Sequence, residues 1–399
     1  MKIVIAALSA PCSLNGVSRH AANLARGLLS LPDPPEVHFL AGSWQKEIFP
    51  SSIGRTNSRF HLHMIQIRHS NFARIAWYYR DLPAISSQLE ADVMHMAYPS
   101  PVRAGAYRCP TVVSLHDLYP FEIPENFGIV RSEISRRLMR QCLGKIDAIA
   151  CVSDFTKTRI AKWFPSDVSG KALTIPNSIA PLIGAGVAPR QLRDGMPFVL
   201  CVAQHRQNKN VPLALRIFAQ ALRVATLPAQ TRFVVVGNSG PDTQRILNEV
   251  RKLGLPERVI LLSGISDQEL LWCYKNSSLL LAPSSIEGFG LPIAEALTAG
   301  CAVVCSDIPP FREVGGDRCR YVPFGEGMME GYLEAIQQAL NQRRRVGASM
   351  LQLAPVSIAA RYMDLYRKLA GFRGVWQNGM LRHPDSATRE REIPLNERG

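Results

Sequence analysis

The chain has 399 residues, of which 47% are hydrophobic and 20% are charged, and its formal net charge at pH 7 is +14. This length is too great for one ordinary hydrophobic core, so we expect two domains in a globular protein. The positive charge predicts acidic partners such as phosphate, anionic lipid or nucleic acid, and mere solubility is the alternative explanation.

The cysteines and the apolar stretches argue against a zinc protein, a secreted protein and a membrane-spanning protein. Nine cysteines are scattered along the chain, and Cys301 and Cys305 have no matching pair or histidine, so we interpret them as core residues in a reducing compartment and not as zinc ligands. The apolar start, residues 1–10, leads into a glycine turn and an amphipathic helix, which favours a buried first strand over a signal peptide. The longest uncharged run, 172–189, contains three prolines and is predicted to be a connection, so no transmembrane helix is expected.

Strands and helices alternate through the first half. Strands are predicted at residues 3–8, 37–41, 92–96, 110–118 and 148–152, and a short one near 173–179. Gly16 lies in the turn after the first strand and precedes an amphipathic helix, an arrangement that suits a phosphate. His116 ends the fourth strand, where side chains point into the crevice of a parallel sheet. A structural histidine is the alternative.

Two basic segments of the first half are ambiguous. Residues 44–80 mix arginines with aromatic residues, and residues 129–146 form a predicted basic helix with Ile134, Leu138, Cys142 and Ile146 at helical spacing. Either segment could contact a membrane or an anionic acceptor, but a solvated face is the default interpretation. Nucleic-acid binding is not expected, because no DNA or RNA module is recognisable.

The second half starts with a buried strand at 198–203, followed by a loop that carries Arg206 and Lys209 and by a helix from Val211. Two cations at a strand-to-helix junction suit a pyrophosphate, although exposed loop charge is the alternative. Further strands are predicted at 232–236, which ends at Gly237, at 259–263, which precedes Ile265, and at 278–283 and 301–306.

The most informative stretch is Ser284–Ala296. A loop with Glu287, Gly288, Phe289 and Gly290 runs into a helix in which Pro292 suits the first turn. Such a junction offers unpaired backbone N–H groups to an anion. Glu287 in the loop and Glu295 one turn into the helix are good acceptors for sugar hydroxyls, so the stretch predicts a nucleotide-sugar ligand.

Glu287 to Pro292, followed by Glu295 and Ala296, resembles the donor-site signature of retaining glycosyltransferases of family four, which have the GT-B fold. Two glutamates separated by seven residues define that signature. The resemblance extends over most of residues 1–370 through His116-Asp117-Leu118, a Val-Ser-x-Phe segment at 152–155 and an Ile-Pro-Asn segment at 175–177. The chain departs from the family pattern at Asn15, Asn208 and Ser178.

The resemblance implies a function for each matching position. Glu287 would hold donor-sugar hydroxyls, Glu295 the ribose, and His116 would lie between sugar and acceptor. Lys209 and Arg206 would neutralise the diphosphate, with Arg206 replacing an arginine that the family places where this chain has Asn208. The remaining donor-binding candidates are Gly16, Gly237, Ile265, Gly288, Phe289, Gly290 and Leu291. Neither a metal nor a cofactor is expected.

The predicted protein is therefore an α/β, GT-B retaining glycosyltransferase that moves a sugar from a UDP- or GDP-linked donor to a glycan or lipid-linked acceptor. The alternatives are a nucleotide-sugar epimerase, a phosphorylase, and a non-catalytic nucleotide-binding protein. An oxidoreductase is disfavoured because GxGxxG is absent.

The predicted domains are 1–185 for the acceptor and 186–355 for the donor. A helix at 356–370 is expected to cross back to the first domain, and a disordered tail is expected at 371–399. We expect a cytoplasmic protein, either free or peripheral on the inner face of the membrane.

Overall fold

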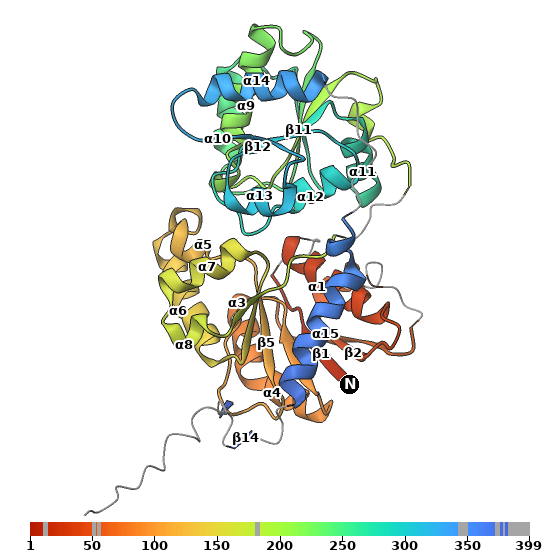
Figure 1. Cartoon of the computed structure of the whole chain (residues 1–399), viewed down its shortest axis with the longest axis vertical. Helices are drawn as coiled ribbons and strands as arrows, with labels where there is room; N and C mark the ends of the chain where they lie inside the picture. The colour runs from red at the N-terminus through yellow and green to blue at the C-terminus, as the bar shows by residue number, and fades with distance from the viewer. Residues whose placement is uncertain are drawn as a thin grey trace, which may run out of the picture.

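The computed structural model describes residues 1–10, 15–49, 53, 57–179, 184–341 and 350–371, and the backbone of 376–377 and 380–381. Within these ranges two parallel sheets, each flanked by helices, are stacked along the long axis of the molecule (Figure 1). The predicted fold class, two parallel α/β domains that face each other, is confirmed.

The first domain is built on a seven-stranded sheet in the order β3-β2-β1-β4-β5-β6-β7, with every neighbouring pair parallel. Its strands are β1 (Lys2–Ala6), β2 (Glu36–Gly42), β3 (Phe60–Ile65), β4 (Val93–Met96), β5 (Thr111–Leu115), β6 (Ala148–Cys151) and β7 (Ala172–Thr174). The central strands are apolar along their whole length because helices bury both faces of the sheet.

Helices divide between the two faces of this sheet. One face packs on α1 (Gly16–Leu29) and on the late helix α15 (Pro355–Gly371). The other face packs on the elements between and after the middle strands. These are a π-helical turn (Trp77–Asp81), α4 (Leu82–Gln88), α5 (Tyr119–Glu122), α6 (Ile129–Lys145), α7 (Asp154–Trp163) and α8 (Ser166–Ser169), while α3 (Asn71–Ala76) precedes the π-helical turn and has no buried residue.

The second domain repeats the plan with a six-stranded parallel sheet in the order β10-β9-β8-β11-β12-β13. The strands are β8 (Phe198–Val202), β9 (Arg232–Val236), β10 (Val259–Leu262), β11 (Leu279–Ala282), β12 (Val303–Ser306) and β13 (Arg320–Val322). The helices are α9 (Val211–Arg223), α10 (Thr243–Lys252), α11 (Asp267–Asn276), α12 (Leu291–Thr298), α13 (Pro309–Gly315) and α14 (Met328–Asn341).

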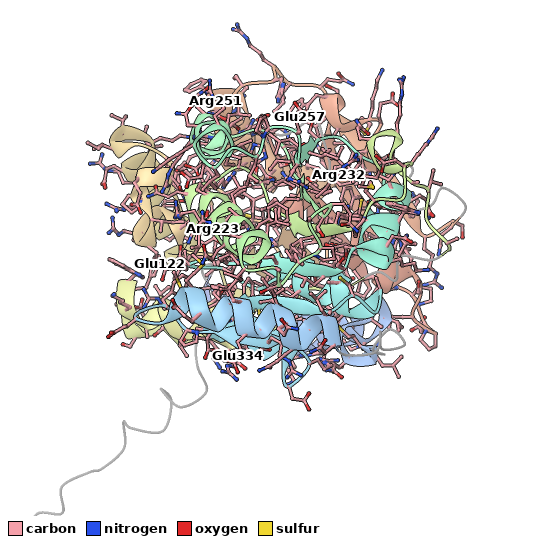
Figure 2. The ribbon with its side chains drawn as sticks, turned by 90° about the horizontal axis from the view of Figure 1, so that it is seen from above. Glu122, Arg223, Arg232, Arg251, Glu257 and Glu334 are labelled. Carbon is pink, nitrogen blue, oxygen red and sulfur yellow. The ribbon has the colours of Figure 1, made fainter. Side chains whose placement is uncertain are left out.

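Helices α9, α10 and α14 pack against one face of the second sheet. The outer surface there carries charges of both signs. Arg223 and Arg251 lie in the last turns of α9 and α10, and Glu257 and Glu334 are exposed as well (Figure 2). We therefore interpret this surface as a solvated face.

The strand orders explain where a ligand can bind. In each sheet the order reverses beside the first strand, between β1 and β4 and between β8 and β11. Ligands of open parallel sheets bind in the crevice outside the carboxyl ends of the strands at such a reversal. In Figure 1 the rims that carry α12 and α13 of the second domain and α1 and α7 of the first face each other across the gap.

The late helix α15 returns from the second domain and lies along α1 of the first (Figure 1). The contact is close: a Cβ at Gly27 of α1 would lie 2.3 Å from the carbonyl oxygen of Pro355. Tyr362 and Tyr366 of α15 are fully buried and reach polar side chains of the first sheet. A chain segment synthesised after the second domain thus completes the core of the first.

The structure differs from the sequence expectations in the first domain's outer parts. Strand β3 and helices α3 and α4 fall in or beside the basic stretch 44–80, where we predicted no elements. Helix α7 is capped by Ser153, whose side chain accepts from the Thr156 amide. In α6, Ile134 was expected on the apolar stripe, yet its side chain is 51% exposed, because the start of this helix extends beyond the part packed on the sheet.

The proposed domain limits at 185/186 and 355/356 stay predictions, with β7 and β8 as the nearest strands on either side of the first limit. The tail 371–399 lies outside the described residues, apart from Gly371 and the backbone of two paired strands, β14 (Trp376–Gln377) and β15 (Met380–Leu381). Among the described residues, no helix is long and apolar enough to cross a bilayer.

Candidate active site

A cleft of about 720 Å³ lies between the two domains. All twelve residues selected from the sequence line it: Gly16, His116, Arg206, Lys209, Gly237, Ile265, Glu287, Gly288, Phe289, Gly290, Leu291 and Glu295. They come from both sheets and follow the carboxyl ends of the strands, so the fold gathers residues that are up to 279 positions apart in the sequence.

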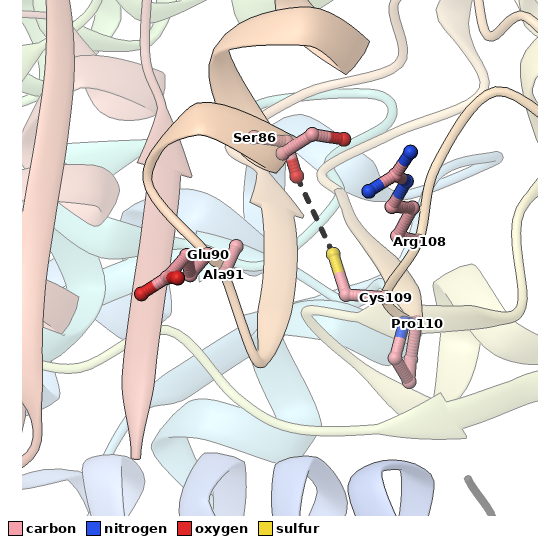
Figure 3. A pocket seen from close by; sticks show the side chains of 7 residues that line it. Ser86, Glu90, Ala91, Arg108, Cys109 and Pro110 are labelled. Carbon is pink, nitrogen blue, oxygen red and sulfur yellow. Dashed lines mark hydrogen bonds between the residues drawn. The ribbon is translucent and has the colours of Figure 1, made fainter.

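A second hollow lies at the opposite end of the first sheet, between the end of α4 and the start of β5 (Figure 3). Its lining includes Ser86, Glu90, Arg108 and Cys109, and the Ser86 hydroxyl lies 3.4 Å from the Cys109 sulfur. None of the twelve candidate residues lines it, so the interdomain cleft is the candidate active site.

Glu287 and Lys209 form an ion pair at the centre of the cleft. The Lys209 ammonium lies 2.7 Å from both carboxylate oxygens of Glu287, and Tyr119 of the first domain donates to the same carboxylate at 3.2 Å. Only 8% of the Glu287 side chain is exposed, so the pair is largely withdrawn from water. An ionised carboxylate offers about four lone-pair positions, so these contacts leave roughly one for a ligand hydroxyl.

The loop after Glu287 prepares the start of α12. Gly290 precedes the helix with φ +113°, a conformation that suits glycine, and a Cβ there would also meet Phe311 at 2.9 Å. Pro292 lies in the first turn, where its missing N–H is not needed. The Ile293 amide already bonds the Gly290 carbonyl at 3.0 Å, so the amides that precede Pro292 are the ones that the start of α12 can offer to an anion.

Gly288 is the point at which this loop touches the first domain. Its carbonyl accepts hydrogen bonds from Ser153 at 2.6 Å and from Thr156 at 3.2 Å. A Cβ on Gly288 would lie 1.8 Å from the carbonyl oxygen of His116. The glycine is needed here for a close approach of two backbones across the cleft.

Asn208, which stands where the resembling family has an arginine, is a buried interdomain contact. Its amide donates to the Ile286 carbonyl at 3.1 Å, and its oxygen accepts from Asn126 of the first domain at 3.1 Å. Arg206 lines the cleft two residues earlier, so the loop still presents two cations, Arg206 and Lys209. Asn15 likewise replaces a family glycine, and its side chain caps α1 by accepting from the Ser18 amide at 2.9 Å.

Glu295 lies deeper in the second domain and accepts from Tyr274 at 2.9 Å. Burial raises the pKa of Glu295, and the nearby Arg19 partly opposes this rise. Arg19 itself comes from α1 and reaches across the cleft to Asp267 at the start of α11, with a shortest N–O distance of 2.7 Å. The Glu295 carboxylate thus lies under the influence of a cation from the first domain, Arg19.

His116 is held in one tautomer. Its Nε2–H donates to the Ala97 carbonyl at 2.9 Å, which leaves Nδ1 as an acceptor. Burial lowers the pKa of His116 to about 4, so the ring is neutral at neutral pH. The ring of His20 packs edge-on against it with centroids 4.8 Å apart.

Behind His116 lies a buried polar cluster that joins α15 to the first sheet. The Ser114 hydroxyl lies 2.8 Å from His20 Nε2, 2.9 Å from His95 Nε2 and 3.1 Å from the Tyr362 hydroxyl. His95 Nδ1 bonds the Tyr366 hydroxyl, and burial lowers the pKa of His95 to about 3. The cluster fixes the strand end that carries His116.

Sequence reasoning missed several residues of the cleft. Asp117 lines it, and burial raises the pKa of its carboxyl to about 6, although Arg206 and Lys209 oppose the rise. Tyr119, Arg19 and Asp267 were missed as well, because their contacts depend on how the two domains meet. Of these residues, only Asp117 could have been predicted from the sequence, because it directly follows His116 at the end of a strand.

Residues 14–181 match the sequence profile described as Glycosyltransferase Family 4, and residues 188–349 match that described as Glycosyl transferases group 1. The two matches follow one another and span both domains and the cleft. The chain belongs to glycosyltransferase family 4.

Relatives of this family 4 glycosyltransferase agree with that assignment. It is 24% identical over 338 residues to the O-antigen chain mannosyltransferase B of Escherichia coli, covering 79% of this chain and 85% of that one. It is 25% identical over 173 residues to the GDP-mannose:cellobiosyl-diphosphopolyprenol alpha-mannosyltransferase of Xanthomonas campestris, covering 41% and 45%.

Among solved structures, the family 4 glycosyltransferase is similar to WaaG, a glycosyltransferase involved in lipopolysaccharide biosynthesis. The TM-score is 0.62 at 20% identity, with 92% of this chain and 97% of that chain covered. The likeness confirms the predicted GT-B fold. Because family 4 comprises retaining enzymes, the predicted activity of a retaining glycosyltransferase with a nucleotide-sugar donor and a glycan acceptor is confirmed.

Proposed function

We propose that the enzyme transfers a mannosyl group from GDP-mannose to a lipid-linked glycan, and that the twelve residues of the cleft bind the donor and carry the transfer. The observation that supports the site assignment is the Lys209–Glu287 pair beside the start of α12, which places cations, amides and a carboxylate around one space. Mannose and GDP are inferred from the relatives, which are named mannosyltransferases.

The nucleoside end of the donor would lie against the second domain. Glu295 would accept from the ribose hydroxyls while Tyr274 continues to donate to its other side. Gly237 would lie beside the nucleotide. A Cβ at this position would lie 1.9 Å from the Ala203 carbonyl oxygen, so the glycine allows the two backbone segments to pack closely. Ile265, just after β10, would contact the base.

The diphosphate would lie between Lys209, Arg206 and the amides of Gly288 to Leu291. A donor bound there adds negative charge beside Lys209, which already neutralises Glu287. Arg206 supplies the second cation that a diphosphate needs. These groups are in place before the reaction, so they stabilise charge on the leaving group without reorganisation.

In the transfer step, the bond between the anomeric carbon and the diphosphate oxygen breaks, and its electron pair stays on the GDP. The acceptor hydroxyl oxygen forms the new bond on the same face of the sugar, and its proton passes to the departing diphosphate. Glu287 would hold one sugar hydroxyl through its remaining acceptor position. His116 would accept another through Nδ1, which its bond to Ala97 keeps unprotonated.

The donor assignment is tested by thermal melting of the full chain with GDP, UDP and ADP, each without and then with magnesium. We expect the largest shift with GDP, unchanged by magnesium. A ligand at 100 times its Kd stabilises the folded state by about 2.7 kcal/mol. A larger shift with UDP or ADP would refute GDP-mannose, and no shift with any nucleotide would refute a donor site in this cleft.

The transfer itself is tested with GDP-mannose and a polyprenyl-diphosphate oligosaccharide, following mannosylated product by mass spectrometry. Glu287→Gln should lower kcat/KM at least tenfold, whereas Glu334→Gln on the outer surface should leave it unchanged. Conversion of the nucleotide sugar without any acceptor would instead indicate an epimerase.

We also propose that the start of α6 contacts the membrane that carries the acceptor. Ile129, Val130 and Ile134 are 90%, 74% and 51% exposed, and Arg131 and Arg137 of the same helix are exposed too. Apolar side chains flanked by cations suit an anionic bilayer surface. Replacing the three apolar residues by serine should weaken co-sedimentation with phosphatidylglycerol vesicles while leaving GDP binding unchanged. Equal sedimentation would contradict the contact.

A further inference from the structure

Three histidines and a glutamate gather on one face of the first sheet, at its edge. Glu36 and His38 lie on β2, and His61 and His63 lie on the edge strand β3. The two strands are parallel, with His38 opposite His61, so alternation along each strand puts all four side chains on the same face. The cluster lies at the amino end of the strands, whereas the cleft lies at the carboxyl end.

The distances within the cluster are those of metal ligands. Glu36 Oε1 lies 2.9 Å from His38 Nε2 and 3.4 Å from His61 Nε2, and one ligand atom from each of the three residues lies within 4.8 Å of the others. Tetrahedral zinc with bonds of about 2.0–2.2 Å separates its ligand atoms by roughly 3.3 Å. The His61 side chain is 42% exposed, so its ring has room to turn towards a shared ion.

His63 lies where it can hydrogen-bond a metal-bound His38 without binding the metal itself. Its Nε2 lies 3.0 Å from His38 Nδ1, the ring nitrogen that does not face Glu36. When Nε2 of a histidine binds a metal, the other ring nitrogen carries the proton and donates it to an acceptor. His63 provides that acceptor, and it holds the His38 ring with Nε2 directed at Glu36. Lys2 adds a nearby positive charge, but its ammonium is paired with Glu90 at 3.5 Å.

We propose that Glu36, His38 and His61 bind one divalent transition-metal ion, for which Zn²⁺ fits the ligand types best, and that His63 orients His38. Two imidazoles and one carboxylate suit zinc, with a fourth position left to water. The ion would fasten the edge strand β3 to β2. It would lie outside the cleft, and the proposal does not depend on the donor assignment.

The experiment uses the full chain, purified with a tag that contains no histidine and stripped with a chelator. Zn²⁺ is titrated in competition with a chromophoric chelator, and Co²⁺ is used for absorption spectra. We expect one ion per chain, a higher melting temperature with Zn²⁺, and a Co²⁺ spectrum without thiolate bands.

Variants locate the ion. His61→Gln should weaken Zn²⁺ binding at least a hundredfold, and His63→Gln by about ten- to a hundredfold, as for other outer partners of ligating histidines. His69→Gln is the matched control, because His69 lies in the same domain but bonds the Ala10 carbonyl and stacks on Trp44. Circular dichroism would verify that the variants are folded. Absence of binding, equal binding by His61→Gln, or thiolate bands with Co²⁺ would each overturn the proposal.

Discussion

Gly288→Ala tests whether sugar transfer requires the contact between the Gly288 loop and the first domain that the structure shows. The added Cβ would lie 1.8 Å from the His116 carbonyl oxygen, and bringing that distance to an ordinary contact of 3.4 Å requires a shift of about 1.6 Å. The shift must separate the donor loop from the first domain, where Ser153 and Thr156 bond the Gly288 carbonyl. The acceptor side would then move away from the sugar.

The expected loss follows from that displacement. Misplacing reacting groups by about 1 Å costs roughly a hundredfold in rate, so we expect kcat/KM to fall at least about a hundredfold, or roughly 2.7 kcal/mol of transition-state stabilisation. GDP binding should weaken less than turnover, because Glu295 and Gly237 keep their places beside the nucleoside, whereas the loop that carries Gly288 also offers its amides to the diphosphate. The assay is steady-state mannosyl transfer combined with calorimetric titration of GDP.

The matched control is Gly144→Ala in α6, where an added Cβ meets nothing within 4 Å. It should leave turnover unchanged. If Gly288→Ala retained turnover within about threefold of the parent enzyme, the close backbone approach would not belong to the reactive arrangement, and the reasoning would be refuted.

Three further predictions concern ionisable groups that line the cleft or lie behind it. Lys209→Ala leaves the buried Glu287 carboxylate unpaired, so the protein should lose about 3 kcal/mol of stability and at least tenfold in turnover. Adding Glu287→Gln should recover much of the stability but not the turnover, and a double variant no more stable than the single one in urea would contradict this. Glu295→Gln should weaken GDP binding about tenfold, as expected for losing hydrogen bonds to a charged group, and an unchanged Kd in calorimetry would remove Glu295 from the ribose site. The pKa values of His95 and His116 lie near 3 and 4, below the unfolded value of 6.5. The unfolded chain therefore binds more protons between these values, and stability should fall by up to about 1.4 kcal/mol per pH unit for each ring as the pH drops below 6.5. Asp117, with its pKa raised to about 6, acts in the opposite sense and offsets part of the loss. An equal or higher urea midpoint at pH 5.5 than at pH 7.5 would count against the buried neutral rings.

Local signals in the sequence and the family resemblance were enough to place twelve residues in the cleft. Glu287, Gly290 and Lys209 lie in segments that connect an apolar strand to the next α-helix, and parallel strands bring their carboxyl ends together whatever these segments contain. Strand β3 was missed because an edge strand is only half buried, so Phe60–Ile65 alternates with histidines and shows no continuous apolar run. The bonds of Tyr119 to Glu287 and of Ser153 to Gly288 could not be predicted, since they depend on how two separate domains meet.

The position of α15 constrains how the protein can be made. Its residues leave the ribosome only after the entire second domain, yet Tyr362 and Tyr366 provide partners for Ser114 and His95 inside the first sheet. Until then, the first domain exposes the apolar face of α1 that α15 later covers. The first domain therefore stays incompletely folded while the second domain is translated. During this time the apolar surface of α1 would be the site to which chaperones bind. The two halves of this enzyme cannot be separated by a single cut between the domains without leaving the first one unfinished.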